Sequence, residues 1–153
     1  MYKKITIFTL IFVFIDQMVK ILLNNSIKLY DSIVILKKFF SITLVHNNGG
    51  AFSILENNKV LLIGVAIISL FLIIIFFIKD KKLNNFDIVI YSMLIGGIVG
   101  NLIDRVVYGY VIDYLDFNIF GYNFPIFNFA DILIVVSVVL LFIFSIKEEV
   151  CKK

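Results

Sequence analysis

Three short stretches decide how this chain must fold: GGIVGNLIDR at residues 96–105, VID at residues 111–113 and FNFAD at residues 127–131. They place three aspartates and an arginine in a sequence of 153 residues, of which 61% are hydrophobic. Charged side chains within or beside membrane-length apolar runs are costly and ask for a functional explanation. We therefore treat these stretches as the candidate site and the rest of the chain as its scaffold.

The composition predicts an integral membrane protein with a single domain over residues 1–153. A mean hydropathy of +1.06 is far too apolar for a water-soluble globule. The net charge of +3 comes from lysines in short loops, which indicates membrane topology and not nucleic-acid binding. The single cysteine, Cys151, lies in a charged tail, so neither a disulfide nor a catalytic role is predicted for it.

Four apolar stretches are long enough to cross a membrane as helices: residues 5–23, 60–78, 88–107 and 128–146. The first has the basic start and apolar middle of a secretory signal. No cleavage site of small residues follows it, so we expect it to be retained as a helix.

Two longer segments, residues 24–59 and 108–127, are predicted to lie outside the membrane. In the first, β-branched and aromatic runs at residues 32–36 and 39–45 are typical of strands. The second is rich in aromatic residues that suit a membrane interface and is expected to be a loop. The predicted fold class is an all-α integral membrane protein with four transmembrane helices and a small β-rich structure outside the membrane.

The lysines predict the orientation of these helices. They gather at the amino terminus, between the second and third spans and in the tail: Lys3, Lys4, Lys79, Lys81, Lys82, Lys147, Lys152 and Lys153. The positive-inside rule makes that side cytoplasmic. Four spans then put both termini in the cytoplasm and both long loops, with Asp113 and Asp131, at the outer face of a cell membrane.

Polar residues inside two predicted helices leave alternatives open. Asp16 and Lys20 lie four apart on one helix face, so they form either a structural ion pair or a group near bound substrate. In the third span, Asn101 and Asp104 continue the face of two glycines, where a neighbouring backbone can approach. We interpret Asp104, beside Arg105, as a charge partner or helix-end anchor in preference to a direct catalytic group.

The stretch HNNGG at residues 46–50 follows the second predicted strand. Asn-Gly is by default a turn, but Gly49, Gly50 and Ala51 leave no bulk, which suggests that the backbone comes close to another group. His46 is expected to be a hydrogen-bonded structural residue and not a base.

Asp113 and Asp131 lie 18 residues apart, joined by a loop that lets their carboxyls meet at the membrane surface. Two carboxyls in contact in an apolar site share one proton. Aspartic proteases use such a pair for catalysis, and this mechanism requires no metal or cofactor. Asn128 and Asp131 are also compatible with helix capping alone. A helix dipole would favour the Asp131 anion, which would make Asp131 the general base and Asp113 the proton carrier.

No other nucleophile is predicted, because one histidine and one remote cysteine build neither a catalytic triad nor a zinc site.

Five motifs occur in order along nearly the whole chain. They are Asp16-Gln17-x-x-Lys20, Asn47-x-Gly49-Gly50-Ala51-Phe52, Gly96-Gly97-x-x-Gly100-Asn101-x-x-Asp104-Arg105, Val111-x-Asp113 and Phe127-Asn128-x-Ala130-Asp131. With these residues at this spacing, the sequence resembles the signal peptidase II family. It departs from the family at Gly50, where alanine is usual, and at Tyr114, where phenylalanine is usual; both changes bear on substrate positioning more than on activity.

The resemblance implies an aspartic endopeptidase that removes signal peptides from diacylglyceryl-modified prolipoproteins, cutting before the lipidated cysteine. It implies Asp113 and Asp131 as the catalytic pair, a four-helix fold with a β cradle on the outer face, contact with membrane lipids, and inhibition by globomycin-type compounds. Residues implied to bind substrate or support the site are Asp16, Lys20, Asn47, Gly49, Asn101, Asp104, Arg105 and Asn128. It implies no metal, cofactor or nucleic acid.

A small transporter or channel is the alternative from another class, because polar groups in a helical bundle also mark ion pathways. The second span carries no charge and the carboxylates cluster near one face, which favours the peptidase. A purely structural bundle would leave the carboxylates unexplained.

Overall fold

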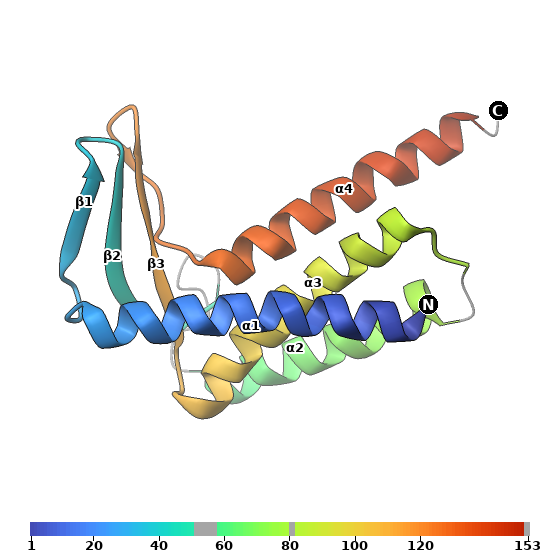
Figure 1. Ribbon diagram of the computed structural model, residues 1–153, viewed down its shortest axis with the longest axis horizontal. Helices are drawn as coiled ribbons and strands as arrows, with labels where there is room; N and C mark the ends of the chain where they lie inside the picture. Colours follow the sequence, from blue (N-terminus) through green and yellow to red (C-terminus); the bar gives the residue numbers. More distant parts are fainter. Residues whose placement is uncertain (51–57, 80–81, 152–153) are drawn as a thin grey trace.

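The computed structural model describes residues 1–50, 58–79 and 82–151, and side chains as far as residue 145. In chain order the elements are α1 (Tyr2–Ser26), β1 (Ser32–Leu36), β2 (Phe40–Asn47), α2 (Lys59–Leu72), its π-helical continuation η2 (Ile73–Ile78), α3 (Asn85–Val107), β3 (Val111–Ile119), β4 (Tyr122–Asn123) and α4 (Phe129–Cys151). The strands stand at one end of the helices, opposite the amino terminus (Figure 1). The predictions made for Ala51, Phe52, Lys81, Lys152 and Lys153, and for the side chains of Lys147 and Cys151, lie outside the described residues.

Three helical segments are long and apolar enough to cross a membrane: Tyr2–Ser26, Lys59–Ile78 and Asn85–Val107. The predicted spans at 5–23, 60–78 and 88–107 fall within them. The apolar part of α4 among the described residues, Phe129–Ser145, is shorter, so a fourth crossing stays a prediction.

A side-chain cap sets the start of α3 three residues before the predicted span. The Asn84 side chain accepts hydrogen bonds from the backbone N–H groups of Phe86 and Asp87, and Asp87 returns one by accepting from the Asn84 N–H. This capping box satisfies N–H groups that the first helical turn leaves without partners.

The four strands form one antiparallel sheet in the order β1-β2-β3-β4. No strand was predicted within residues 108–127, and the structure shows that this segment supplies β3 and β4. Strand β3 pairs with β2, more than 60 residues earlier in the chain, with Val45 opposite Asp113. Strand formation here depends on a long-range partner, which a local pattern does not reveal.

Toward the turns, one face of the sheet carries polar side chains and the other is apolar. Near α1 the first face is apolar too, since Ile112 lies on it. On the polar face, Thr43 Oγ1 is hydrogen-bonded to Ser32 Oγ at 2.9 Å and to Asp116 Oδ2 at 2.7 Å. The apolar face carries the row Ile33, Ile42 and Leu115 and the stacked rings of Phe40 and Phe117, whose centroids lie 4.6 Å apart. Residues two apart on a strand share a face, so Asp113 lies on the apolar face with Leu115 and Phe117.

Two apolar clusters hold this arrangement together. Ile27 at the end of α1 packs with Leu44 of β2 and Ile112 of β3, which fixes the sheet to the helices. At the opposite end, Ile5 and Ile88 form a second cluster with Ile78 and Tyr91.

Candidate active site

Asp113 is the third residue of β3, and its side chain is almost fully buried. Its Oδ1 accepts a hydrogen bond of 2.6 Å from Asn128 Nδ2, and its Oδ2 accepts one of 2.9 Å from Asn47 Nδ2. Asn47 ends β2 opposite Val111. The register of the sheet therefore brings this amide to the carboxylate.

Asp131 lies in the first turn of α4 and forms a reciprocal cap with Asn128. Asn128 Oδ1 accepts from the Asp131 N–H at 3.0 Å, and Asp131 Oδ2 accepts from the Asn128 N–H at 3.1 Å, as in a capping box. The other carboxylate oxygen, Oδ1, accepts a hydrogen bond of 2.7 Å from Asn101 Nδ2. Asp131 therefore caps the helix with one carboxylate oxygen and takes part in the polar site with the other.

The structure brings Asp113 and Asp131 together at one cavity of about 650 Å³. Asn128, which is fully buried, hydrogen-bonds to both carboxylates and so links them. The cavity also receives the side chains of Asn47, Asn101 and Arg105. Its apolar walls come from α2 and α4 and include Leu62, Val65, Ala66, Ile132, Val135 and Val136.

Asp16 and Lys20 form the ion pair that the sequence allowed, and Asp104 joins it. Lys20 Nζ lies 2.9 Å from Asp16 Oδ2 and 2.8 Å from Asp104 Oδ2, and all three side chains are fully buried. Buried charges are tolerated when they are paired and hydrogen-bonded. None of the three is among the described residues that line the cavity.

The two aspartates of this cluster also hold the backbone beside Asp113 and Asp131. Asp104 Oδ2 accepts a hydrogen bond of 3.2 Å from the N–H of Ile112, the residue before Asp113. Asp16 Oδ1 accepts one of 3.1 Å from the N–H of Ala130, the residue before Asp131. The cluster therefore fixes both chain segments that carry the candidate dyad.

Two glycines of α3 let the neighbouring elements come this close. A Cβ atom on Gly100 would lie 2.5 Å from Asp16 Oδ2, and one on Gly97 would overlap the carbonyl oxygen of Ala130. A larger residue at either position would push α1 or α4 away from α3.

Arg105 connects the third helix to the turn after β2. Its Nη2 donates a hydrogen bond of 3.0 Å to the Gly49 carbonyl, whose own N–H donates to Asn47 Oδ1 at 2.9 Å. Its Nε is buried and has no hydrogen-bond partner among the described residues. A cationic donor without a partner beside the cavity suits a carbonyl or ester oxygen.

The electrostatics favour a proton on Asp113. Burial raises the pKa of Asp113 to about 7, and the nearby charge of Asp131 adds to this rise. The amide hydrogen bonds from Asn47 and Asn128 act in the opposite direction. The Asp113 carboxyl is therefore substantially protonated near neutral pH.

His46 has a structural environment, as the sequence predicted. Its Nε2 is hydrogen-bonded to Asn24 Oδ1 at 2.9 Å, and its ring stacks on Tyr110 at a centroid distance of 3.9 Å. Burial lowers its pKa. Among the described residues, no group of three or more His, Cys, Asp or Glu side chains could hold a metal ion.

Neither Gln17 nor Tyr114 was predicted from the sequence to be a site residue. Gln17 Nε2 donates to Asp104 Oδ1 at 2.8 Å and to the Gly100 carbonyl at 3.2 Å, so it completes the buried cluster. The Tyr114 hydroxyl accepts a hydrogen bond of 3.3 Å from the Phe129 N–H at the start of α4. Gln17 could have been predicted from the sequence, because it lies within the first motif, between Asp16 and Lys20.

Comparison with known proteins gives a consistent result. The model of the family described as signal peptidase (SPase) II matches residues 8–147. The lipoprotein signal peptidase of Staphylococcus aureus strain MRSA252 is 42% identical over 149 residues, covering 97% of this chain and 90% of that protein, and that of strain JH9 is 41% identical over the same lengths.

Two solved structures share the fold and are described as bacterial membrane enzyme structures determined by the in meso method. The one at 2.3 Å resolution has a TM-score of 0.89 and 39% identity, over 97% of this chain and 91% of that one. The one at 1.9 Å has a TM-score of 0.83 and 39% identity, over 94% and 92%.

Proposed function

Because this chain belongs to the signal peptidase II family and removes signal peptides from prolipoproteins, we propose that it does so as an aspartic endopeptidase with Asp113 and Asp131 as its reacting groups. The observation that carries this proposal is the pair of carboxyls at one cavity, linked by Asn128. The transporter or channel alternative is not favoured, since relatives at this identity and coverage are peptidases.

In the proposed mechanism, a water molecule lies between the two carboxyls and the scissile carbonyl. The oxygen of the water molecule attacks the carbonyl carbon while Asp131 accepts a proton from that water. At the same time, protonated Asp113 donates its proton to the carbonyl oxygen. The tetrahedral intermediate then collapses. The C–N bond breaks, the new amine takes the proton that Asp131 holds, and Asp113 recovers its proton from the hydroxyl group.

The surroundings of each carboxyl support this division of roles. Asp131 lies at a helix N-terminus and accepts hydrogen bonds from Asn101 and the Asn128 N–H, all of which stabilise an anion. Asp113 is more deeply buried and has a raised pKa.

We propose that the apolar walls of the cavity receive the diacylglyceryl group. The lining residues Val65 of α2 and Val135 of α4 are strongly exposed, so the cavity has apolar surface available to lipid-like ligands. Arg105 and Asn101 supply donors close to the dyad for the peptide and ester carbonyls, while Asn47 holds the Asp113 carboxylate.

The proposed orientation puts the sheet outside the cell and both termini in the cytoplasm. The end of η2 and the start of α3, next to Lys79 and Lys82, lie at the same end as the amino terminus, away from the sheet (Figure 1). The positive-inside rule places that end in the cytoplasm. This orientation requires α4 to be a fourth span.

The experiment that tests this function compares a purified diacylglyceryl-modified prolipoprotein with its unlipidated twin in detergent. We expect only the lipidated precursor to be cut, at the bond before the modified cysteine, with no loss on adding a metal chelator. Equal cleavage of both precursors would contradict the proposed lipid recognition. Loss with chelator would contradict the aspartic mechanism.

A further inference from the structure

Two tight turns meet at the end of the sheet farthest from α1 (Figure 1). One joins β1 to β2 and carries Lys37 and Lys38; the other joins β3 to β4 and carries Phe120. Together with Phe39 and Ile119, we call these residues the sheet tip. A pocket of about 540 Å³ lies between the two turns.

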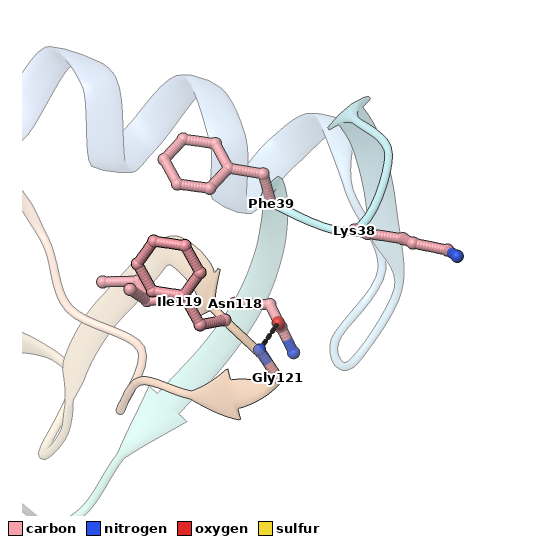
Figure 2. Close-up of a pocket in the computed structure, with 6 residues that line it drawn as sticks. Lys38, Phe39, Asn118, Ile119 and Gly121 are labelled. Atoms are coloured by element: carbon pink, nitrogen blue, oxygen red, sulfur yellow. Dashed lines mark hydrogen bonds between the residues drawn. The ribbon is translucent and has the colours of Figure 1, made fainter.

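The sheet tip exposes a concentrated apolar surface. Figure 2 shows the ring of Phe39 lying opposite Ile119 across the pocket. Phe39 and Ile119 are 48% and 42% exposed, and Phe120 is fully exposed. Large apolar side chains that are exposed together around one pocket are consistent with a site of interaction.

The backbone at Phe120 adds to this argument. Phe120 and Gly121 have φ angles of 52° and 86°, and the turn is held by a hydrogen bond of 3.0 Å from the Gly121 N–H to Asn118 Oδ1 (Figure 2). A left-handed turn of this type favours asparagine or glycine at both central positions. A fully exposed aromatic residue here is unfavourable locally, so a contact outside the described chain would compensate for it.

The position of the tip indicates which partner it contacts. It stands to one side of helices that are long and apolar enough to cross a membrane (Figure 1). The apolar face of the sheet continues from the tip through the stacked rings of Phe40, Phe117 and Phe127 to the cavity, while Thr43 and Asp116 are on the opposite face. A sheet lying on the bilayer with this face inward would bury the apolar surface and leave the polar surface in water.

The charges of the tip suit the surface of an anionic membrane. Lys37 and Lys38 are exposed, and the Lys38 side chain extends away from the pocket (Figure 2). The nearest acid on the adjoining strands, Asp116, is hydrogen-bonded on the other face. Aromatic residues flanked by lysines are typical of segments that insert at the headgroup level.

We propose that the sheet tip inserts into the outer leaflet of the bilayer, with Phe120, Phe39 and Ile119 among the acyl chains and Lys37 and Lys38 on anionic lipid phosphates. The sheet would then be held at membrane depth at both ends, by the helices and by its tip. This inference goes beyond peptide cleavage and does not depend on it.

The chain contains no tryptophan, so Phe120→Trp provides a single fluorescent reporter. The matched control is Val34→Trp, on the polar face of the same sheet and 59% exposed. Both proteins are reconstituted in phosphatidylcholine vesicles containing phosphatidylglycerol, with acyl chains brominated close to the headgroup. We expect blue-shifted emission and several-fold stronger quenching for Phe120→Trp than for Val34→Trp.

Adding Lys37→Gln and Lys38→Gln to the reporter should remove the dependence of quenching on phosphatidylglycerol. Equal quenching of the two reporters, or water-like emission from Phe120→Trp, would overturn the proposal. A blue shift that grows with the protein-to-lipid ratio would also overturn it, since a second copy of the chain would then cover the tip. Cleavage of the lipidated precursor in detergent shows that each variant is folded, and its failure would bear on the proposed function and not on the quenching result.

Discussion

Lys20 Nζ donates a hydrogen bond of 2.9 Å to Asn101 Oδ1, and this contact connects the buried charges of α1 to the proposed dyad. Asn101 in turn donates to Asp131 at 2.7 Å. The same lysine neutralises Asp16 and Asp104, which hold the backbone beside the two dyad residues. The geometry of the candidate site therefore depends on a lysine that does not line the cavity.

Replacing Lys20 by methionine should destabilise the protein strongly, because two buried carboxylates lose their counter-charge. Breaking a buried pair by removing one partner typically costs about 3–5 kcal/mol. We expect a large fall in the thermal unfolding midpoint in detergent. Lys28→Met, at an exposed lysine just beyond α1, is the control and should change the midpoint little; comparable loss in both variants would contradict the structural role of Lys20.

Asp113→Asn and Asp131→Asn should each reduce kcat by at least about 10²-fold, since each removes a group that transfers a proton. Both proteins should still fold, as judged by their unfolding midpoints. Asp104→Asn should instead lower stability and retain measurable turnover at low temperature. An inactive but stable Asp104→Asn protein, together with an active Asp113→Asn protein, would show that the dyad is misassigned.

Activity should fall as the pH rises through about 7, because the proposed mechanism requires a proton on Asp113, whose pKa is about 7 in the folded protein. The stability of the folded protein should also fall as the pH rises. The pKa of this carboxyl is higher in the folded protein than its ordinary value of 3.8, so the folded state binds more protons between these values and loses stability as the pH rises through them. Unfolding midpoints measured across this range should decline in the parent protein and decline less in Asp113→Asn.

Gly100→Ala should impair both folding and cleavage, since the added methyl group would lie 2.5 Å from Asp16 Oδ2. The matched control is Gly64→Ala in α2, where a Cβ would meet nothing within 4 Å. That variant should be neutral or more stable by up to about 1 kcal/mol, the usual gain of alanine over glycine inside a helix. A tolerated Gly100→Ala would mean that α1 and α3 are not as closely packed as described.

Tyr114→Phe tests the hydrogen bond that the Phe129 N–H donates to the Tyr114 hydroxyl. Removing the hydroxyl leaves the Phe129 N–H without its acceptor. Because this hydrogen bond is only partly buried, the loss should be at or below the lower end of the roughly 1–3 kcal/mol that a fully buried group costs. We expect a lower unfolding midpoint with kcat changed only a few-fold. An unchanged midpoint would show that this N–H finds another acceptor.

The helices could be predicted from the sequence because crossing a membrane sets a minimum length of apolar residues. The ends of the helices could not be predicted. A side-chain cap at Asn84 sets the start of α3, and no sequence pattern indicates that Ile73–Ile78 continues α2 as a π-helix. Strand β3 was missed because Asp113 and Asp116 interrupt its apolar character, and it forms only by pairing with β2.

The residues of the candidate site could be predicted from the sequence motifs. The resemblance to the family's motifs selected Asp113, Asp131 and the asparagines around them. The structure places Asp113, Asp131, Asn47 and Asn101 along one cavity, with Asn128 buried beside it. The partners of each oxygen could not be read from spacing. They depend on how α1 and α3 face each other, which explains why Gln17 was overlooked and why Ile112 and Ala130, whose backbones are anchored, were not considered.

The shared lysine also has a consequence for the biogenesis of the protein. Asp16 and Lys20 can neutralise each other as soon as α1 enters the bilayer, but Asp104 gains a counter-charge only when α3 meets α1. Helix α2 contributes nothing to this neutralisation and is free to join late. We expect a chain stalled during insertion, with α3 not yet against α1, to be recognised by membrane quality-control proteases, and pulse-chase labelling of Lys20→Met should show faster turnover than that of the parent.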